Sequence, residues 1–153
     1  MAKLGVSEDV LNNPQVELLP IEEMRTVGGI DKMVKCEYIA QINSTKISNT
    51  KKDGAEQMVA TVGIERADGV IYMDDYFSYK KPFVERLASL AKMLGLDFAN
   101  LDSDDFLSKY VWITIKHDKF TRTDGSVVES NKVGEYIRPT TKEELEAHGL
   151  LTF

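Results

Sequence analysis

The sequence predicts a mostly β domain with one main helix, and three observations lead to this fold class. Apolar residues recur at every second position in five segments between residues 33 and 137, which is the period of a half-buried strand. Between the third and fourth segments the apolar period changes to about 3.6, which is the period of a helix. The 153 residues, 42% hydrophobic and 29% charged, suffice for one domain with a single core.

The first three strands are predicted to form an antiparallel meander. The first segment begins near residue 33, and the polar turn 48–54 separates it from the second. A tight turn at residues 67–69 leads to the third, because Asp-Gly readily adopts the positive φ values of short hairpins. The residues expected to face inward are Val34, Cys36, Tyr38, Ala40 and Ile42, then Met58, Ala60, Val62 and Ile64, then Ile71, Met73 and Phe77.

An amphipathic helix is predicted after the third strand. Pro82 near its first turn and Gly95 at its end provide start and stop signals. A short helical turn is expected to begin at Ser103 in the acidic stretch that follows. The apolar side of the main helix consists of Phe83, Leu87, Leu90 and Leu94.

A second strand pair completes the pattern. The fourth strand alternates from residue 110 to 116 with Val111, Ile113 and Ile115 inward, and the fifth runs from 127 to 137 after the turn 121–126. Three strands, a helix and two strands is the connectivity of the OB-fold, a five-stranded Greek-key barrel. The sequence therefore predicts an OB-fold-like barrel, with an open α+β sheet and a split sandwich as alternatives.

The two ends of the chain differ from the middle in charge. Residues 1–31 are predicted to form an N-terminal arm with a hinge at residues 27–29, residues 32–139 the barrel, and residues 140–153 an acidic C-terminal helix or tail. Thr141 and Glu144 form a capping box there. The net charge of −6 divides into −4 in 1–31, 0 in 32–138 and −2 in 139–153. A neutral body still binds a polyanion where its cations share one face, because phosphate contacts are local.

The residue pattern gives little support to catalysis. The two histidines lie far apart in sequence, and the chain has neither a phosphate-binding glycine-rich loop nor a Gly-x-Ser-x-Gly motif. The acidic pairs at 74–75 and 104–105 leave a metal-dependent nuclease as an alternative, although neighbours on a strand point to opposite faces. We expect no enzyme activity, no catalytic residue, no cofactor and no bound metal.

Binding of single-stranded DNA has more support. If alternate residues fill the core, Tyr72, Tyr76 and Trp112 lie on the outer face of the sheet, where unpaired bases can stack on exposed rings. The two long turns add cations at the positions that line the ligand groove of an OB-fold. The predicted nucleic-acid-binding residues are Tyr72, Tyr76, Trp112, Lys116, Lys119, Arg122, Lys51 and Lys52. The alternative is that these rings pack under the helix or the arms, since aromatic residues favour strands for packing alone.

The segment "DYFSYKKPFVERLASLAKMLGLDFANLDSDDFLSKYVWITIKHDKFTRTDGSVVESNKVGEYIRP" resembles a phage-encoded family of unknown-function proteins related to single-stranded-DNA-binding proteins. The shared pattern is a strand ending in an aromatic residue, a helix ending in Leu-Gly-Leu, a Leu-x-x-x-x-Phe-x-x-Lys stretch and a final strand pair. Residues 17–139 follow that order, including "ELLP" before the first strand. The resemblance implies an OB-fold and a place in phage DNA replication or recombination. The neutral body and the "RTVGGIDKM" opening depart from the commoner form of the family.

The sequence thus predicts a protein that binds single-stranded DNA in the cytoplasm of a bacterial host. The lone Cys36 excludes a disulfide framework and fits a reducing compartment, and no apolar run has the roughly 18 residues of a membrane span. Homo-oligomerisation is left open. The first alternative is a non-catalytic module that recruits replication or recombination proteins through the acidic C-terminal segment, and the second is the nuclease.

Overall fold

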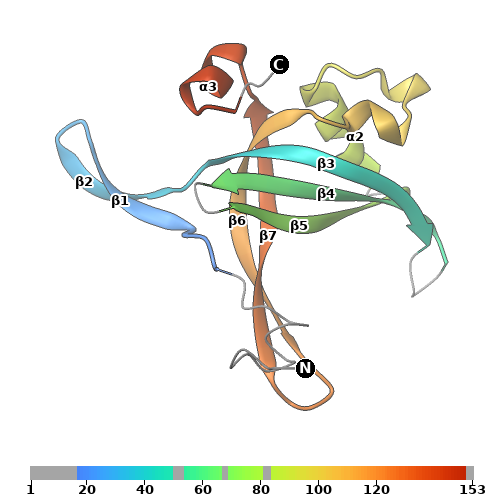
Figure 1. The fold of residues 1–153 in the computed structure, drawn as a ribbon, viewed down its shortest axis with the longest axis horizontal. Coiled ribbons are helices and arrows are strands. Elements are labelled where there is room, and N and C mark those ends of the chain that lie inside the picture. Colours follow the sequence, from blue (N-terminus) through green and yellow to red (C-terminus); the bar gives the residue numbers. More distant parts are fainter. Residues whose placement is uncertain (1–16, 50–53, 67–68, 81–83, 151–153) are drawn as a thin grey trace, which may run out of the picture.

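The structure is a computed structural model that describes residues 17–49, 54–66, 69–80 and 84–150. These residues form seven strands in two antiparallel sheets, together with two α-helices and two 3-10 turns (Figure 1). The strands are β1 (Glu22–Val27), β2 (Ile30–Lys35), β3 (Tyr38–Asn49), β4 (Glu56–Arg66), β5 (Gly69–Ser78), β6 (Tyr110–Thr121) and β7 (Val127–Pro139). The helical elements are α2 (Val84–Met93), η1 (Phe98–Asn100), η2 (Ser103–Phe106) and α3 (Lys142–Ala147). None of the helices in these residues has the length and apolar character that crossing a bilayer requires.

The main sheet has five strands in the order β5-β4-β3-β6-β7. The meander β3-β4-β5 and the hairpin β6-β7 are as predicted, and β3 in the centre pairs with both β4 and β6. The chain therefore leaves the sheet at the β5 edge, passes through α2 and returns beside β3. A closed barrel is not confirmed, because β5 and β7 are the two edges of the sheet and no backbone ladder joins them within the described residues.

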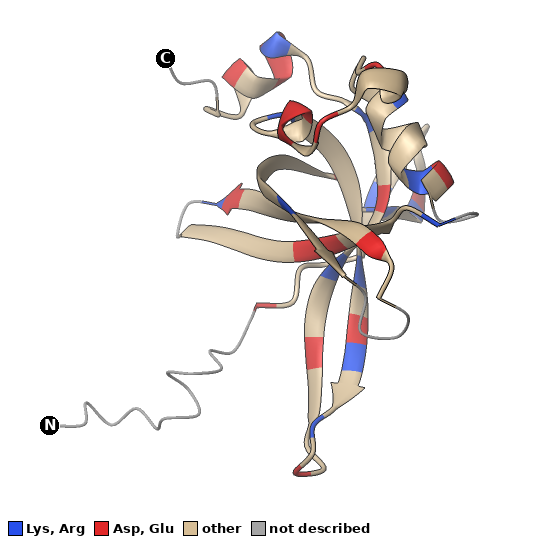
Figure 2. Cartoon of the chain, turned by 90° about the vertical axis from the view of Figure 1, so that its right-hand side faces the viewer, with Lys and Arg blue, Asp and Glu red and all other residues tan. Residues whose placement is uncertain are grey.

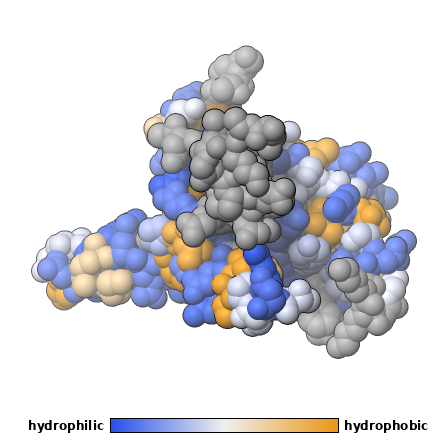
Figure 3. Space-filling model, turned by 60° about the horizontal axis from the view of Figure 1, so that its bottom comes forward, coloured by the Kyte–Doolittle hydropathy of each residue, from blue (hydrophilic) through white to orange (hydrophobic). Residues whose placement is uncertain are grey.

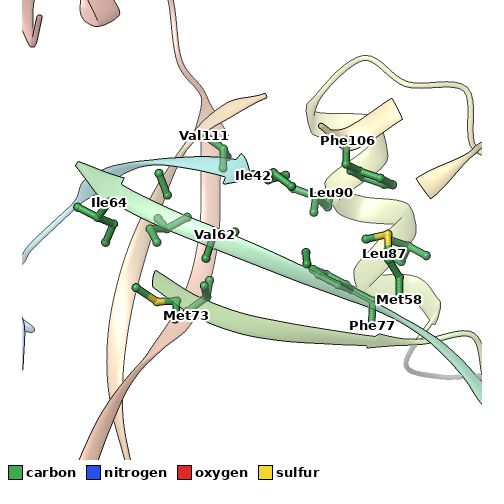
Figure 4. Close-up of a cluster of buried hydrophobic side chains, with 14 of the residues drawn as sticks. Ile42, Met58, Val62, Ile64, Met73, Phe77, Leu87, Leu90, Phe106 and Val111 are labelled. Carbon is green, nitrogen blue, oxygen red and sulfur yellow. The ribbon is translucent and has the colours of Figure 1, made fainter. Parts of the chain in front are cut away.

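The predicted alternation correctly identifies the inner face of the sheet. Ala40, Ile42, Ala60, Val62 and Ile113 are fully buried, as the period of two requires. The prediction is wrong for Val34, because β3 begins at Tyr38 and the half-buried Val34 belongs to β2, outside the main sheet. From the main helix, Leu87 and Leu90 point toward Met58, Phe77 and Phe106 and close one end of this core (Figure 4). The lone Cys36 is also buried, at 5% exposure, and acts as a small hydrophobic residue there.

Helix α2 ends where the sequence predicts, because Gly95 has the positive φ of 73° that only glycine adopts easily. The amide of Leu96 then bonds the carbonyl of Ala91 at 2.8 Å. The expected turn at Ser103 is η2, whose capping box is formed by Asp102 and Asp105 and whose Phe106 is fully buried. The expected start at Pro82 and the inward Phe83 lie outside the described residues.

The glycine hinge predicted at residues 27–29 is the turn of the hairpin β1-β2, while residues 1–16 of the predicted arm lie outside the described residues. Gly28 and Gly29 have φ values of 60° and 79°, the two successive positive values of a type I′ hairpin turn, so they connect two strands and are not a hinge. The strand count is therefore seven and not five, and the expected boundary at residue 31 falls inside β2. The hairpin projects from the body at the left of Figure 1.

Residues 17–20 fasten the region before the hairpin to the base of the β6-β7 ribbon. Leu19 is fully buried, and its amide bonds Asn131 Oδ1 at 2.9 Å while its carbonyl contacts His117 Nε2 at 2.7 Å. Asn131 Nδ2 also donates to the carbonyl of Glu17 at 2.8 Å. His117 and the buried Asn131 thus have a structural task, because a backbone group buried without a partner is costly.

Side chains join the two open edges of the main sheet. Asp75 of β5 faces inward, with its side chain 13% exposed, and accepts two hydrogen bonds from Arg86 of α2 at 2.9 and 2.7 Å. Tyr136 of β7 donates its hydroxyl to the same carboxylate at 2.7 Å. The Arg86 guanidinium also lies 4.7 Å from the ring centre of Phe77. We call Asp75, Arg86 and Tyr136 the seam cluster.

Removing the cation of the seam cluster is expected to destabilise the fold. Arg86→Met leaves the nearly buried carboxylate of Asp75 with the Tyr136 hydroxyl as its remaining seam partner, so the free energy of unfolding should fall by about 1–3 kcal/mol. Urea denaturation followed by circular dichroism measures the change. The matched control is Lys92→Met, an exposed cation on the same helix, for which the expected change is within about 0.5 kcal/mol. Equal stability of the two variants would show that the seam does not depend on Arg86.

The seam cluster should also make the fold less stable at alkaline pH. Burial, and then the negative charge of Asp75, raise the pKa of Tyr136 well above its usual value. The fold therefore favours the protonated phenol, and this contribution is complete below about pH 10, where an unfolded tyrosine begins to ionise, and is lost as the pH rises further. The free energy of unfolding should fall less steeply above that pH in Tyr136→Phe than in the parent, while the matched Tyr72→Phe keeps the parent slope. Parallel curves for Tyr136→Phe and the parent would contradict this role.

Candidate nucleic-acid interface

The outer face of the main sheet carries two of the predicted rings. Cross-strand partners share a face, so Gln41, Gly63 and Tyr72 form one row across β3, β4 and β5. A second row is Lys46, Val59 and Tyr76. Tyr72 is 57% exposed and Tyr76 is 52% exposed, as the alternation predicts.

Gly63 keeps the floor beneath Tyr72 flat. A Cβ at this glycine would lie 2.6 Å from Asn43 Oδ1, 2.9 Å from Val70 and 3.1 Å from the Tyr72 ring. Any larger residue would therefore displace the ring or its neighbours. A hollow of about 130 Å³ lies alongside, lined in part by Gln41, Asn43 and Val70. The ring of Tyr72 thus rests on the edge of a shallow polar depression.

The charges around the two tyrosines are mixed. Lys46 lies two strands away from Tyr76 in the same row, and Asp74 lies between the tyrosines on the same face. Asp74 accepts a hydrogen bond from Thr61 at 2.6 Å. The face therefore offers rings and hydrogen-bonding groups to a ligand, and only a modest positive charge.

Trp112 is also on the outer face, but α3 covers it. The indole meets His148 edge-on with ring centres 5.8 Å apart, and the Arg138 guanidinium stacks on it at 4.7 Å. The indole Nε1 is buried and makes no hydrogen bond of good geometry. The pKa of the nearby Glu144 carboxyl is lowered, mainly by the hydrogen bond from the Thr141 amide and to a smaller extent by the Trp112 indole. Trp112 is therefore not presented as an open stacking surface in this structure.

The long β6-β7 ribbon carries the predicted cations on two faces. It extends below the body in Figure 1, and both signs of charge are distributed along it in Figure 2. Lys116 pairs in register with Lys132, and Phe120 pairs with Val128 on that same face. Phe120 is 50% exposed and Lys116 is exposed. An aromatic ring and two lysines therefore share one side of the ribbon.

Ion pairs within the ribbon limit how many of its cations can meet a ligand. Lys132 lies 2.8 Å from Asp118, and its hydrogen bond and charge lower the pKa of that exposed carboxyl. Lys119 lies on the side of the ribbon opposite Lys116, where it forms an ion pair with Glu129 at 3.2 Å. The half-buried Arg122 lies in the turn, where its amide bonds the carbonyl of Ser126 at 2.8 Å.

The eight predicted residues are thus brought together only in part. Tyr72 and Tyr76 share the sheet face, Lys116 belongs to one side of the ribbon and Lys119 to the other, and Lys51 and Lys52 lie outside the described residues. The predicted set does not include Phe120 and Lys132, which lie on the same side of the ribbon as Lys116. Continuing the alternation from Lys116 would have placed Phe120 on the same side, whereas Lys132 needs the register of the hairpin.

The acidic residues proposed for a nuclease are engaged elsewhere. Asp74 and Asp75 point to opposite faces as expected, the first toward Thr61 and the second into the seam cluster. Among the residues that the structure describes, no three His, Cys, Asp or Glu side chains are placed to hold a metal ion. Asp104 and Asp105 belong to η2, where Asp105 completes a capping box.

A larger hollow of about 310 Å³ lies between the start of β3, the end of β4 and α3. Tyr38, Arg66, Trp112 and His148 line it in part. The Tyr38 hydroxyl donates to the carbonyl of Pro20 at 2.7 Å, and burial, followed by the nearby Cys36, raises its pKa to about 12. This hollow is therefore framed by residues that fasten the hairpin and α3 to the sheet.

The cover over Trp112 should be visible in its fluorescence. Thr141 is the N-cap of α3, and Thr141→Ala removes a cap worth about 1 kcal/mol from a helix of six residues. Fraying of α3 should expose the indole and shift its emission to longer wavelength, and removal of residues 140–153 should shift it further. Since Trp112 is the one tryptophan of the chain, the signal is unambiguous. Lys142→Ala, at the next and exposed position, is the control, and an unshifted spectrum after truncation would rule out the cover.

The chain has no match among protein-family models, among curated proteins or among solved structures. The resemblance found in the sequence therefore stays a prediction, and the function is argued from the surfaces described above.

Proposed function

We propose that this chain binds single-stranded nucleic acid, with DNA as the expected form, through the outer sheet face and one side of the β6-β7 ribbon. The observation that carries the proposal is the set of three half-exposed rings, Tyr72, Tyr76 and Phe120, on surfaces that also carry lysines. Tyr72 and Tyr76 lie on the same face of β5 and Phe120 lies on β6, and a cluster of exposed rings on one surface often marks the site of a ligand or partner. Unpaired bases are the ligand that fits, because each has a face that can stack on a ring.

The strand connectivity supports an OB-type barrel as the scaffold. The order β5-β4-β3-β6-β7 with a helix between β5 and β6 is the connectivity of that fold, opened at the β5-β7 seam. The seam cluster holds these edges together through side chains, which substitutes for a backbone ladder. In OB-folds the outer face of the second and third strands and the loop between the fourth and fifth strands bind the ligand. Here those elements are β4, β5 and the ribbon tip.

Stacking contributes more than charge in this proposal. The ribbon residues 116–132 carry four Lys or Arg against three Asp or Glu, so the net positive charge is small. Lys116 is available for phosphate, while Lys132 must exchange Asp118 for a phosphate oxygen. Affinity should therefore depend on salt less steeply than in a strongly basic binder. A role in phage replication or recombination, in the cytoplasm of the host, rests on the sequence resemblance and belongs to this proposal.

The alternative function, recruitment of replication or recombination proteins through the acidic C-terminal segment, has less support from the structure. Glu144 of α3 completes the capping box and lies 3.7 Å from Arg138, so it serves the fold. Glu143 and Glu146 remain exposed on that helix. Two exposed carboxylates on a helix packed over Trp112 form a weaker docking feature than the exposed rings.

Titration of a labelled oligothymidylate of about 30 nucleotides, followed by fluorescence anisotropy over a range of salt, tests the proposal. Phe120→Ala and Tyr76→Ala are each expected to weaken binding by at least about fivefold, since a base-ring contact contributes about 1–3 kcal/mol. Lys116→Ala with Lys132→Ala should reduce the slope of log affinity against log salt by up to about 1.4, because each phosphate contact to a single strand contributes about 0.7.

Matched controls lie on the opposite part of the molecule. Lys92→Ala removes an exposed lysine of α2, and Lys142→Ala removes an exposed lysine of α3. Both should bind like the parent. Equal affinity of Phe120→Ala, Tyr76→Ala and these controls, or no binding by the parent at low salt, would refute the interface. Equal binding to duplex DNA would refute stacking as its basis.

A further inference from the structure

The hairpin β1-β2 exposes apolar side chains that its own fold leaves uncovered. Met24, Val27, Ile30 and Met33 are 61%, 46%, 67% and 53% exposed. Neither strand joins the main sheet, and Figure 3 shows hydrophobic atoms among polar ones along this projection. A two-stranded hairpin alone is marginally stable in water. A surface that covers the hairpin would therefore stabilise it.

The strand register sorts the hairpin into two unlike faces. Val27 pairs with Ile30 at the tip, and Arg25 pairs with Lys32 directly behind them, so these four residues share one face. We call them the basic tip face. Glu23, nearer the base on the same side, forms an ion pair with Arg25. The tip thus presents two branched apolar side chains with a lysine beside them.

A complementary groove lies beside α2. It has a volume of about 270 Å³ and is lined by Met58, Tyr79, Leu87, Phe98, Leu101 and Phe106, among others. Phe98 is 45% exposed and Tyr79 is 38% exposed, so its apolar lining is open to solvent. On one side of the groove, residues 97–106 contain four aspartates and neither Lys nor Arg, whereas Lys80 follows Tyr79 on the other side. We call this the aspartate-rimmed groove. Its apolar floor and acidic rim match the apolar tip and the cations behind it.

The hairpin of one chain cannot fill the groove of that same chain. In Figure 1 the β1-β2 hairpin lies at the left, beyond the start of β3, and α2 lies toward the right end of the long axis. Contact between the two surfaces therefore requires two copies. Because the surfaces differ and lie at opposite ends, the contact is heterologous and repeats from copy to copy.

We infer that the basic tip face of one copy docks in the aspartate-rimmed groove of a second copy, which joins the chains head to tail. Val27 and Ile30 cover the exposed edges of Phe98 and Tyr79, and Lys32 approaches the exposed Asp104 on η2. The occupant is another copy of this chain, on the complementarity of charge and apolar character between its two ends. This assembly does not depend on nucleic-acid binding and is measured without it.

Sedimentation velocity of the full chain over a wide range of concentration tests the inference. The parent should form species larger than one chain as concentration rises, and Ile30→Glu or Phe98→Glu should each weaken self-association by at least about tenfold. A mixture of these two variants is the decisive sample. One retains the groove and the other the hairpin, so together they should form a complex of one chain each and grow no further.

Charge reversal separates this contact from general stickiness. Lys32→Glu and Asp104→Lys should each weaken self-association, and the chain that carries both changes should recover it. Val127→Glu, at a valine 61% exposed on the tip of the other hairpin, is the matched control and should associate like the parent. A parent that stays monomeric at all concentrations would overturn the inference. So would a dimer that none of the hairpin and groove variants weakens, or variants that fail to combine when mixed.

Discussion

The rest of the structure depends on how the main sheet is held together where its two edge strands meet. Strand β5 and strand β7 share no backbone ladder in the described residues, so side chains must bridge them. Asp75 does this from one edge, Tyr136 from the other and Arg86 from the helix above. Because Asp75 must face inward to reach its partners, its neighbours Asp74 and Tyr76 must face outward. The constraint that closes the core therefore also presents the tyrosines to solvent, and it places α2 over the end of the core, where the aspartate-rimmed groove forms.

Features with a local cause could be predicted from the sequence. The period of two identified the strands and their inner faces, Gly95 ended α2, and the capping boxes of η2 and α3 lie where acidic residues follow a cap. Hairpin β1-β2 could not be recognised by burial periodicity, because Met24 and Ile30 are exposed. The cover over Trp112 depends on α3 packing against a strand some thirty residues earlier, and no local rule specifies such a contact. Leu19 is fully buried for the same reason, through Asn131 far along the chain.

Because the ribbon has two different faces, a single strand would contact the cations of only one face at a time. Lys116, Phe120 and Lys132 can meet a ligand together, whereas Lys119 on the opposite side is paired with Glu129. A strand that follows the first side gains one ring and two cations, and it reaches Lys119 only by crossing the ribbon. The sheet face adds Tyr72, Tyr76 and Lys46 without adding much charge. In the proposed function, base stacking would be the main source of affinity, and binding would tolerate many sequences because every base has a stackable face.

Because each copy carries little positive charge, head-to-tail contact between copies would raise the affinity of the proposed binder for a single strand. Few phosphate contacts would leave each copy of the proposed binder with modest affinity, yet a tenfold gain in occupancy needs only about 1.4 kcal/mol from a neighbouring copy. Covering two half-exposed side chains such as Val27 and Ile30 is worth roughly 1–3 kcal/mol in total, at about 25 cal/mol per Å² of apolar surface removed from water. In free solution the loss of translational and rotational freedom opposes this gain, so self-association of the free chain is expected at the upper end of the concentration range. On a shared strand much of that cost has already been met, since neighbouring copies are held at high effective concentration. The projecting hairpin and the exposed rings would then act together, with the strand aligning the copies and the hairpins linking them.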